Sequence, residues 1–267
     1  VDVVVELLDA RIPLSSANPV LREIVGDKPR LIVLNKADLA DEAATRAWVK
    51  YFAEQELVAV PVDAVKGRGV KELVQAIAKC AKPKTNKLVQ HGAKARSARC
   101  MILGIPNVGK SSLINRLSGG SKTKVENRPG VTRAKQWIRL GAQLELLDMP
   151  GILWPKFEDQ QAALHLAFTG AINDNVYDVA SVVLLLLDTL RTAYPSALIE
   201  RYRLEGELPS GVGLLEEIGR KRGCLRAGGR VDDEKAQQIV LTDFRSGRLG
   251  CVTLDTLPFT ESAEDAR

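Results

Sequence analysis

GIPNVGKS, residues 104–111, is the stretch of sequence that decides the fold. The apolar run Cys100-Met101-Ile102-Leu103 before it predicts a buried strand, and a helix is expected to begin after it, at Ser112. Gly104 and Gly109 allow a tight turn, so that successive N–H groups face one point in front of a helix N-terminus. A loop in this context is typical of phosphate binding. The alternative is a glycine-rich turn with an exposed lysine.

The side chains of this loop have separate predicted roles. We expect Lys110 to reach the β- and γ-phosphates of a nucleotide, and the Ser111 hydroxyl to bind Mg²⁺. The residues predicted to bind nucleotide here are Asn107, Val108, Gly109, Lys110, Ser111 and Ser112.

A second motif, Asn35-Lys36-Ala37-Asp38, follows the apolar run 31–34 and lies upstream of the phosphate loop. Guanine presents N1–H and a 2-amino group, which one carboxylate can accept together, and Asp38 fits that role. We expect Asn35 to tie this segment to the phosphate loop, and the Lys36 stem to lie along the face of the base. Taken alone, the tetrapeptide is more simply a solvated helix start capped by Asp38.

The order of the two motifs is the reverse of the usual one. In an ordinary small GTPase the phosphate loop opens the domain and NKxD follows much later. The order here predicts a circularly permuted GTPase with GTP and GDP as ligands. Asp63-Ala64-Val65 lies where such a domain would place the weak motif whose backbone contacts the guanine oxygen, so Asp63 and Ala64 are candidate binding residues. An ordinary strand-to-helix turn is the alternative.

Asp148-Met149-Pro150-Gly151 ends another apolar run and is the predicted triphosphate sensor. Asp148 would hold Mg²⁺ through water, and the Gly151 N–H would meet the γ-phosphate. Thr132 is the candidate for the second hydroxyl on Mg²⁺, with Thr123 as the alternative, and either could be a plain surface residue.

Ile152 follows this motif, where Ras-like enzymes have a glutamine that orients the attacking water. An aliphatic side chain cannot orient water, so we expect slow hydrolysis by the chain alone. The candidates for stabilising the transition state are Lys110, Thr132 and Gly151, and no general base is assigned.

Strand patterns alternate with helical ones over residues 1–172, which predicts an α/β domain with a mostly parallel sheet. A helix is expected at about 70–79, and the polar, basic residues 82–97 predict a linker that holds the permutation joint. Residues 173–267 predict a smaller, all-helical domain. The expected strands are 3–8, 31–34, 58–62, 100–103, 136–140 and 144–147, and the expected C-terminal helices are 179–192, 196–204, 213–222 and 232–242.

Net charge, cysteine spacing and the length of apolar stretches limit the partners and compartments that the sequence predicts. The net charge of +5 and pI near 9.0 suit a polyanion such as RNA. The four cysteines lack metal-ligand spacing, which favours a reducing compartment, and the longest apolar stretch, 179–187, is too short to cross a bilayer. The chain opens at Val1 inside a strand pattern, so we expect its natural N-terminus to be missing. A basic cluster could neutralise RNA phosphates or be a solvated helix face; it comprises Arg220, Lys221, Arg222, Arg226 and Arg230.

With these motifs in place, the chain resembles the ribosome biogenesis GTPase A family, also called YlqF-type, of circularly permuted GTPases. The resemblance also covers Asp9-Ala10-Arg11-Ile12-Pro13 and the C-terminal segment 241–250. It implies GTP hydrolysis stimulated by the immature large ribosomal subunit, and contact with its rRNA partly through the C-terminal domain. It further implies a monomer with neither DNA nor a membrane as partner, in the cytoplasm or alternatively in the mitochondrial matrix.

The resemblance implies two details of the site. Asn107 matches the asparagine that in related GTPases helps to hold K⁺ beside the β- and γ-phosphates. The family often carries a basic, histidine-containing segment upstream of the first strand, and this sequence begins after that segment. Asp63 departs from the small hydroxyl or amide residue common at its position.

Two other functions stay open. One is a GTP-dependent signalling or scaffolding switch that binds a protein through its C-terminal domain. The other is a small-subunit assembly GTPase, which is disfavoured because the sequence has no room for an N-terminal barrel and no ligands for a zinc site.

Overall fold

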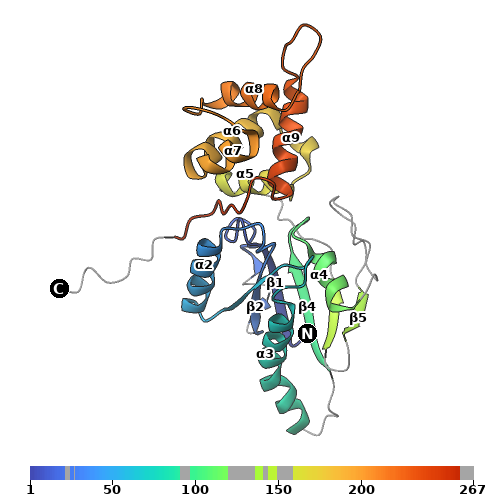
Figure 1. Cartoon of the computed structure of the whole chain (residues 1–267). Helices are drawn as coiled ribbons and strands as arrows, with labels where there is room; N and C mark the ends of the chain where they lie inside the picture. Colours follow the sequence, from blue (N-terminus) through green and yellow to red (C-terminus); the bar gives the residue numbers. More distant parts are fainter. Residues whose placement is uncertain are drawn as a thin grey trace, which may run out of the picture.

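The structure is a computed structural model that describes residues 1–21, 25–26, 28–90, 97–119, 136–140, 144–148 and 159–258; the side chains of 83–90, 136, 138–140 and 148 are outside this description. Two units are visible in Figure 1, a sheet flanked by helices and a separate group of helices stacked on one end of it. This arrangement confirms the predicted α/β fold followed by helices.

The sheet contains all six strands that the sequence predicted. They are β1 (Val3–Asp9), β2 (Arg30–Asn35), β3 (Val58–Val62), β4 (Ala98–Gly104), β5 (Gln136–Leu140) and β6 (Leu144–Asp148), in the spatial order β3-β2-β1-β4-β6-β5. Every neighbouring pair is parallel except β5 with β6. Pro61 is tolerated in β3 because that strand lies at the edge of the sheet.

Helices cover both faces of the sheet, which explains why its strands are continuously apolar. On one face, β1 residues of odd number pack with α3 (Val70–Gln90) and α4 (Lys110–Leu117). On the other face, Leu8, Ile32 and Leu34 pack against Trp48 and Phe52 of α2 (Glu42–Glu54). Helix α2 was not predicted from the sequence.

The predicted linker begins too early. Helix α3 continues to Gln90, well past the expected end near residue 79, so a linker can begin only after residue 90. Six of the eleven residues 80–90 favour a helix by intrinsic propensity: three lysines, one alanine, one leucine and one glutamine. Pro83 lies inside the helix, where it removes one backbone donor, and it does not end the helix here.

The helical unit consists of α5 (Gln160–Phe168), a 3-10 turn η1 (Asp174–Val176), α6 (Val179–Ala193), α7 (Pro195–Tyr202), α8 (Gly211–Lys221) and α9 (Asp233–Arg245). The last four match the helices expected from the sequence. Helix α5 precedes the predicted domain boundary at residue 172, yet it packs against α6 and α9. In the part of the chain that the structure describes, no single helix is long and apolar enough to cross a membrane.

The chain returns to the sheet after α9. Backbone N–H groups of Val252 and Leu254 donate to the carbonyls of Leu39 and Arg11, at 3.0 and 2.7 Å. Asp255 then accepts hydrogen bonds from the Ser15 hydroxyl and backbone and lies 2.7 Å from His165 Nδ1. His165 is 3% exposed, so it serves as a structural link between the two units. His91 lies outside the described residues.

Candidate nucleotide-binding site

The site lies at the edge of the sheet where the parallel strands end. Strands β1 and β4 are neighbours, and the chain leaves them toward opposite sides of the sheet, which makes this a topological switch point. Ligands of open α/β sheets bind in the crevice at such a point. Here the crevice is a cavity of about 970 Å³, which is large enough for a nucleotide.

The phosphate loop adopts a backbone that requires its glycines. Gly109 has a φ of +95°, and a Cβ atom there would lie 2.3 Å from Asn35 Nδ2. At Gly104 a Cβ atom would lie 2.9 Å from the Leu7 carbonyl oxygen. Lys110 begins α4 and is 7% exposed, so the helix N-terminus and its lysine lie at the predicted phosphate position.

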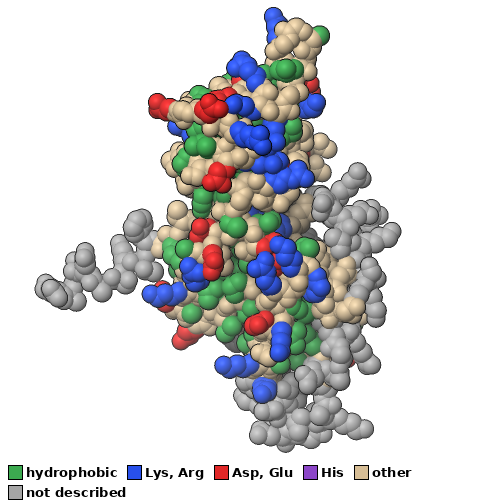
Figure 2. Space-filling view, viewed as in Figure 1, with side chains coloured by type: hydrophobic (Ala, Val, Ile, Leu, Met, Phe, Trp, Pro, Cys, Tyr) green, Lys and Arg blue, Asp and Glu red, His purple; other side chains and the backbone are tan. Residues whose placement is uncertain are grey.

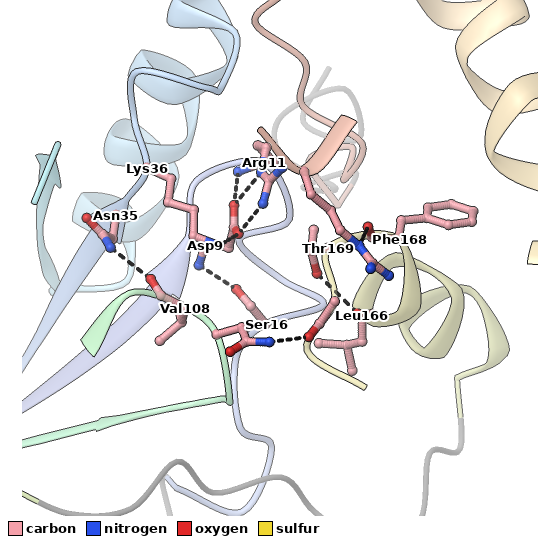
Figure 3. A network of polar contacts seen from close by, with 12 residues as sticks. Asp9, Arg11, Ser16, Asn35, Lys36, Val108, Leu166, Phe168 and Thr169 are labelled. Carbon is pink, nitrogen blue, oxygen red and sulfur yellow. Dashed lines mark hydrogen bonds and ion pairs between the residues drawn. The ribbon is translucent and has the colours of Figure 1, made fainter. Parts of the chain in front are cut away.

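Asn35 makes the predicted tie between the two motifs. Its Nδ2 donates to the Val108 carbonyl at 2.8 Å (Figure 3), and its Oδ1 accepts from the Ala64 N–H at 3.2 Å. The side chain is 2% exposed. One buried amide therefore fixes three loops that come from β2, β3 and β4.

Asp9, at the end of β1, forms a buried charge network that the sequence analysis missed. It accepts from Arg11 Nε and Nη2 at 2.9 and 2.8 Å and from Lys36 Nζ at 2.9 Å (Figure 3). Burial alone would raise the pKa of Asp9, but the charges of Arg11 and Lys36 outweigh it and hold that pKa below its usual range. Burial lowers the pKa of Lys36, against the attraction of Asp9. Thus the ammonium group of Lys36 is held toward β1.

Asp63 is bonded within its own loop, whereas Asp38 lines the cavity. Asp63 is 3% exposed, and its Oδ1 accepts from the Val65 and Lys66 N–H groups at 3.0 and 2.8 Å. Its carboxylate therefore shapes the loop. The Ala64 N–H is engaged by Asn35, and its contact with the guanine oxygen stays a prediction. Asp38 lines the cavity, with its carboxylate 3.8 Å from the Lys66 ammonium.

Several predicted residues cannot be placed. Thr132, Thr123, Gly151 and Ile152 lie outside the described residues, and of Asp148 only its backbone, at the end of β6, is described. Among the side chains that the structure describes, no three His, Cys, Asp or Glu residues gather as a metal site. The Mg²⁺ ligands Ser111, Thr132 and Asp148 therefore stay predictions.

Together these features define a circularly permuted P-loop GTPase domain. A family model described as "50S ribosome-binding GTPase" matches residues 99–208. The ribosome biogenesis GTPase A of Bacillus cereus is 48% identical, over 99% of this chain and 90% of the relative. The chain belongs to the ribosome biogenesis GTPase A family, and it is a GTPase.

Further relatives agree with this membership. The mitochondrial ribosome-associated GTPase 1 of Mus musculus is 34% identical, over 96% of this chain and 83% of the relative. A solved structure of GNP-bound YlqF from T. maritima is 27% identical and covers 95% of this chain and 92% of its own, with a TM-score of 0.63.

Proposed function

We propose that this GTPase acts in late maturation of the large ribosomal subunit, that it binds pre-ribosomal rRNA in the GTP state, and that hydrolysis releases it. The observation that carries the proposal is a basic cavity of about 650 Å³ in the helical unit. One acidic side chain, that of Glu200, lines this cavity. Five basic side chains line it as well: Arg201, Arg203, Lys221, Arg222 and Arg248.

These basic groups are arranged to face a polyanion. Asp243 is 1% exposed and accepts two hydrogen bonds from Arg201, of 2.9 and 2.8 Å, and a longer one of 3.4 Å from Arg248. One buried carboxylate thus faces two arginines, which leaves a net positive charge. Arg203 is exposed, with a φ of +55° at the end of α7. Figure 2 shows Lys and Arg side chains gathered on the visible face of the helical unit. Such clusters bind RNA phosphates and release counterions.

The basic cluster predicted from the sequence divides into two parts. Lys221 and Arg222 line the cavity. Arg220 pairs with Glu216 at 2.9 Å, and Arg226 pairs with Asp232 at 3.0 Å, outside the cavity lining. Lys221 also has an acidic neighbour, since its ammonium lies 3.7 Å from the exposed Glu205 carboxylate.

Catalysis would use the phosphate loop and the ions that it binds. Lys110, Thr132 and Gly151 would stabilise the transition state, and Mg²⁺, when bound, would neutralise phosphate charge. We further propose K⁺ as a ligand of Asn107. Its Nδ2 donates to the Gly170 carbonyl at 2.7 Å, so Oδ1 is the atom left to coordinate the cation.

The proposed partner implies where the protein acts. A monomer that binds pre-ribosomal particles, without DNA or a membrane as partner, would act in the cytoplasm, with the mitochondrial matrix as the alternative. The names of the bacterial and mouse relatives support these two compartments. Binding of a protein through the helical unit, as in a signalling or scaffolding switch, is the second candidate.

The test is cosedimentation with immature large ribosomal subunits in the presence of GDP or a non-hydrolysable GTP analogue. We expect binding with the analogue that weakens steeply between about 50 and 200 mM salt. The double variant Arg203→Glu/Arg248→Glu should abolish binding, while Arg46→Glu, on the exposed face of α2, should not. Equal binding by both variants would exclude the basic cavity, and no binding by the wild type in either nucleotide state would favour the scaffold.

A further inference from the structure

The nucleotide cavity has a wall that comes from the helical unit. Its lining includes the connection between α5 and α6, residues 169–175 without Ala171, and part of α9. An α/β domain of this kind needs only its own loops to hold a guanine nucleotide. The wall from the helical unit therefore suggests an additional contact with some part of the nucleotide.

The residues that line the rest of the cavity indicate which part of the nucleotide this is. Lys36, Asp38 and the loop 63–65 surround the predicted base position, and Gly109 with Ser112 marks the start of the phosphates. The ribose joins these two groups, so it must lie between them. The helical wall lines the same cavity, so a sugar bound at this position would face it.

This wall is held rigidly in place by Arg245 of α9. Its Nε and Nη2 donate to the Phe168 and Ala167 carbonyls at 3.1 and 2.9 Å, and its guanidinium pairs with Asp174 at 2.7 Å. These bonds satisfy carbonyls at the end of α5 and fix the connection that follows.

Gly170 joins the wall to the phosphate loop. It has a φ of +75°, and a Cβ atom there would lie 3.2 Å from the Arg245 guanidinium, so a larger residue would displace the connection. Its carbonyl accepts the 2.7 Å hydrogen bond from Asn107 Nδ2. The wall and the phosphate loop therefore keep a fixed separation, which suits direct contact with a ligand.

Two exposed amides of the wall face the cavity. Asn173 Oδ1 accepts from the Asn175 N–H at 3.0 Å, which orients the Asn173 side chain and leaves its NH₂ group to donate. Asn175 also lines the cavity, and its amide offers both a donor and an acceptor. Ribose hydroxyls require the same pair of functions.

We infer that Asn173 and Asn175 bind the ribose hydroxyls of the bound guanine nucleotide, so that the helical unit contributes directly to nucleotide affinity. This role is independent of the ribosomal partner and depends only on nucleotide binding. A helical unit displaced from the sheet would lose these contacts and hold nucleotide less tightly.

The test compares GDP with 2′,3′-dideoxy-GDP by calorimetric titration of the whole chain. The wild type should bind GDP about two- to tenfold more tightly than the dideoxy compound. Asn175→Ala should reduce this ratio, and Asn173→Ala/Asn175→Ala should bring it near one. Gln238→Ala, an exposed amide of α9 outside the cavity lining, should keep the wild-type ratio.

Two results would overturn the inference. One is a wild-type ratio near one, and the other is an unchanged ratio in a double variant that melts like the wild type. Because loss of the Asn173 cap could disturb the 3-10 turn, hydrogen exchange of the wild type gives a second readout. Amides 173–176 should exchange more slowly with GDP than with dideoxy-GDP, and equal exchange would also contradict the contact.

Discussion

Replacement of Asp9 by asparagine is the sharpest test of how the two units are held together. The change keeps the shape of the side chain and removes its charge. Asp9 and Arg11 have side chains that are 1% and 2% exposed, and Arg11 also donates to the Phe244 carbonyl of α9 at 3.2 Å, with its guanidinium over the Phe244 ring. The variant would leave Arg11 buried without its counter-charge.

Breaking a buried ion pair in this way costs about 3–5 kcal/mol, a large share of the about 5–15 kcal/mol that stabilises a typical domain. We expect a drop in melting temperature on the order of 10 °C. The assay is thermal and denaturant unfolding at a fixed GDP concentration, because bound ligand adds to stability. Glu42→Gln is the matched control, since its pair with Arg46 is exposed, and it should cost less than about 0.5 kcal/mol. A loss below about 1 kcal/mol in Asp9→Asn would show that the buried pair of Asp9 and Arg11 does not hold the two units together.

Three further predictions concern the same edge of the sheet. Asn35→Ala removes the amide that ties three loops, so GDP affinity should fall by about 30- to 100-fold in a calorimetric titration, and wild-type affinity would contradict the tie. Asp38→Asn should bind GDP at least about 100-fold more weakly but gain relative affinity for xanthosine diphosphate, because the 2-oxo group of xanthine accepts a hydrogen bond from the new amide. An unchanged ratio of the affinities for GDP and xanthosine diphosphate would contradict the role of Asp38 in reading the base. The pKa of Asp9 in the folded protein lies below its ordinary value of about 3.9. The ionised carboxylate therefore stabilises the fold above about pH 3.9, and this stabilisation is lost as the pH falls toward the pKa of the folded state. In acid unfolding, the difference in free energy of unfolding between the wild type and Asp9→Asn should therefore narrow below about pH 4. A constant difference would contradict a lowered pKa of Asp9.

Most of the sheet was predictable from the sequence because its signals are local. Each strand is an apolar run, and each motif follows a strand end within a few residues. The length of α3 was not predictable in the same way, since residues 80–90 are as polar as a linker and only helix propensity distinguishes them.

The site was predictable only where one motif carries its own chemistry. The network of Asp9 and Lys36 arises because β1 and β2 are parallel neighbours, with Asp9 opposite Asn35 in register. The bond from Asn107 to Gly170 depends on how the helical unit sits on the sheet. Neither contact can be predicted from the spacing of residues in the sequence. The segment Asp9–Pro13, which follows a predicted strand, did indicate that charged residues lie at this edge of the sheet.

Contacts between the two units connect the nucleotide site to the helical unit that we propose binds RNA. The phosphate loop touches the helical unit through Asn107, and the segment 35–38 is connected to it through Lys36, Asp9 and Arg11. The basic cavity lies in the same helical unit. A change at either place can therefore bias the contact between the units.

GTP hydrolysis measured with and without immature large ribosomal subunits tests directly whether the protein is a GTPase that acts on those subunits. The assay is run in K⁺ and in Na⁺ buffer, with Lys110→Ala as the inactive control. We expect slow hydrolysis by the chain alone and strong stimulation by the subunits, greater in K⁺ than in Na⁺. Tight GTP binding with no stimulation by the subunits in either salt would contradict it.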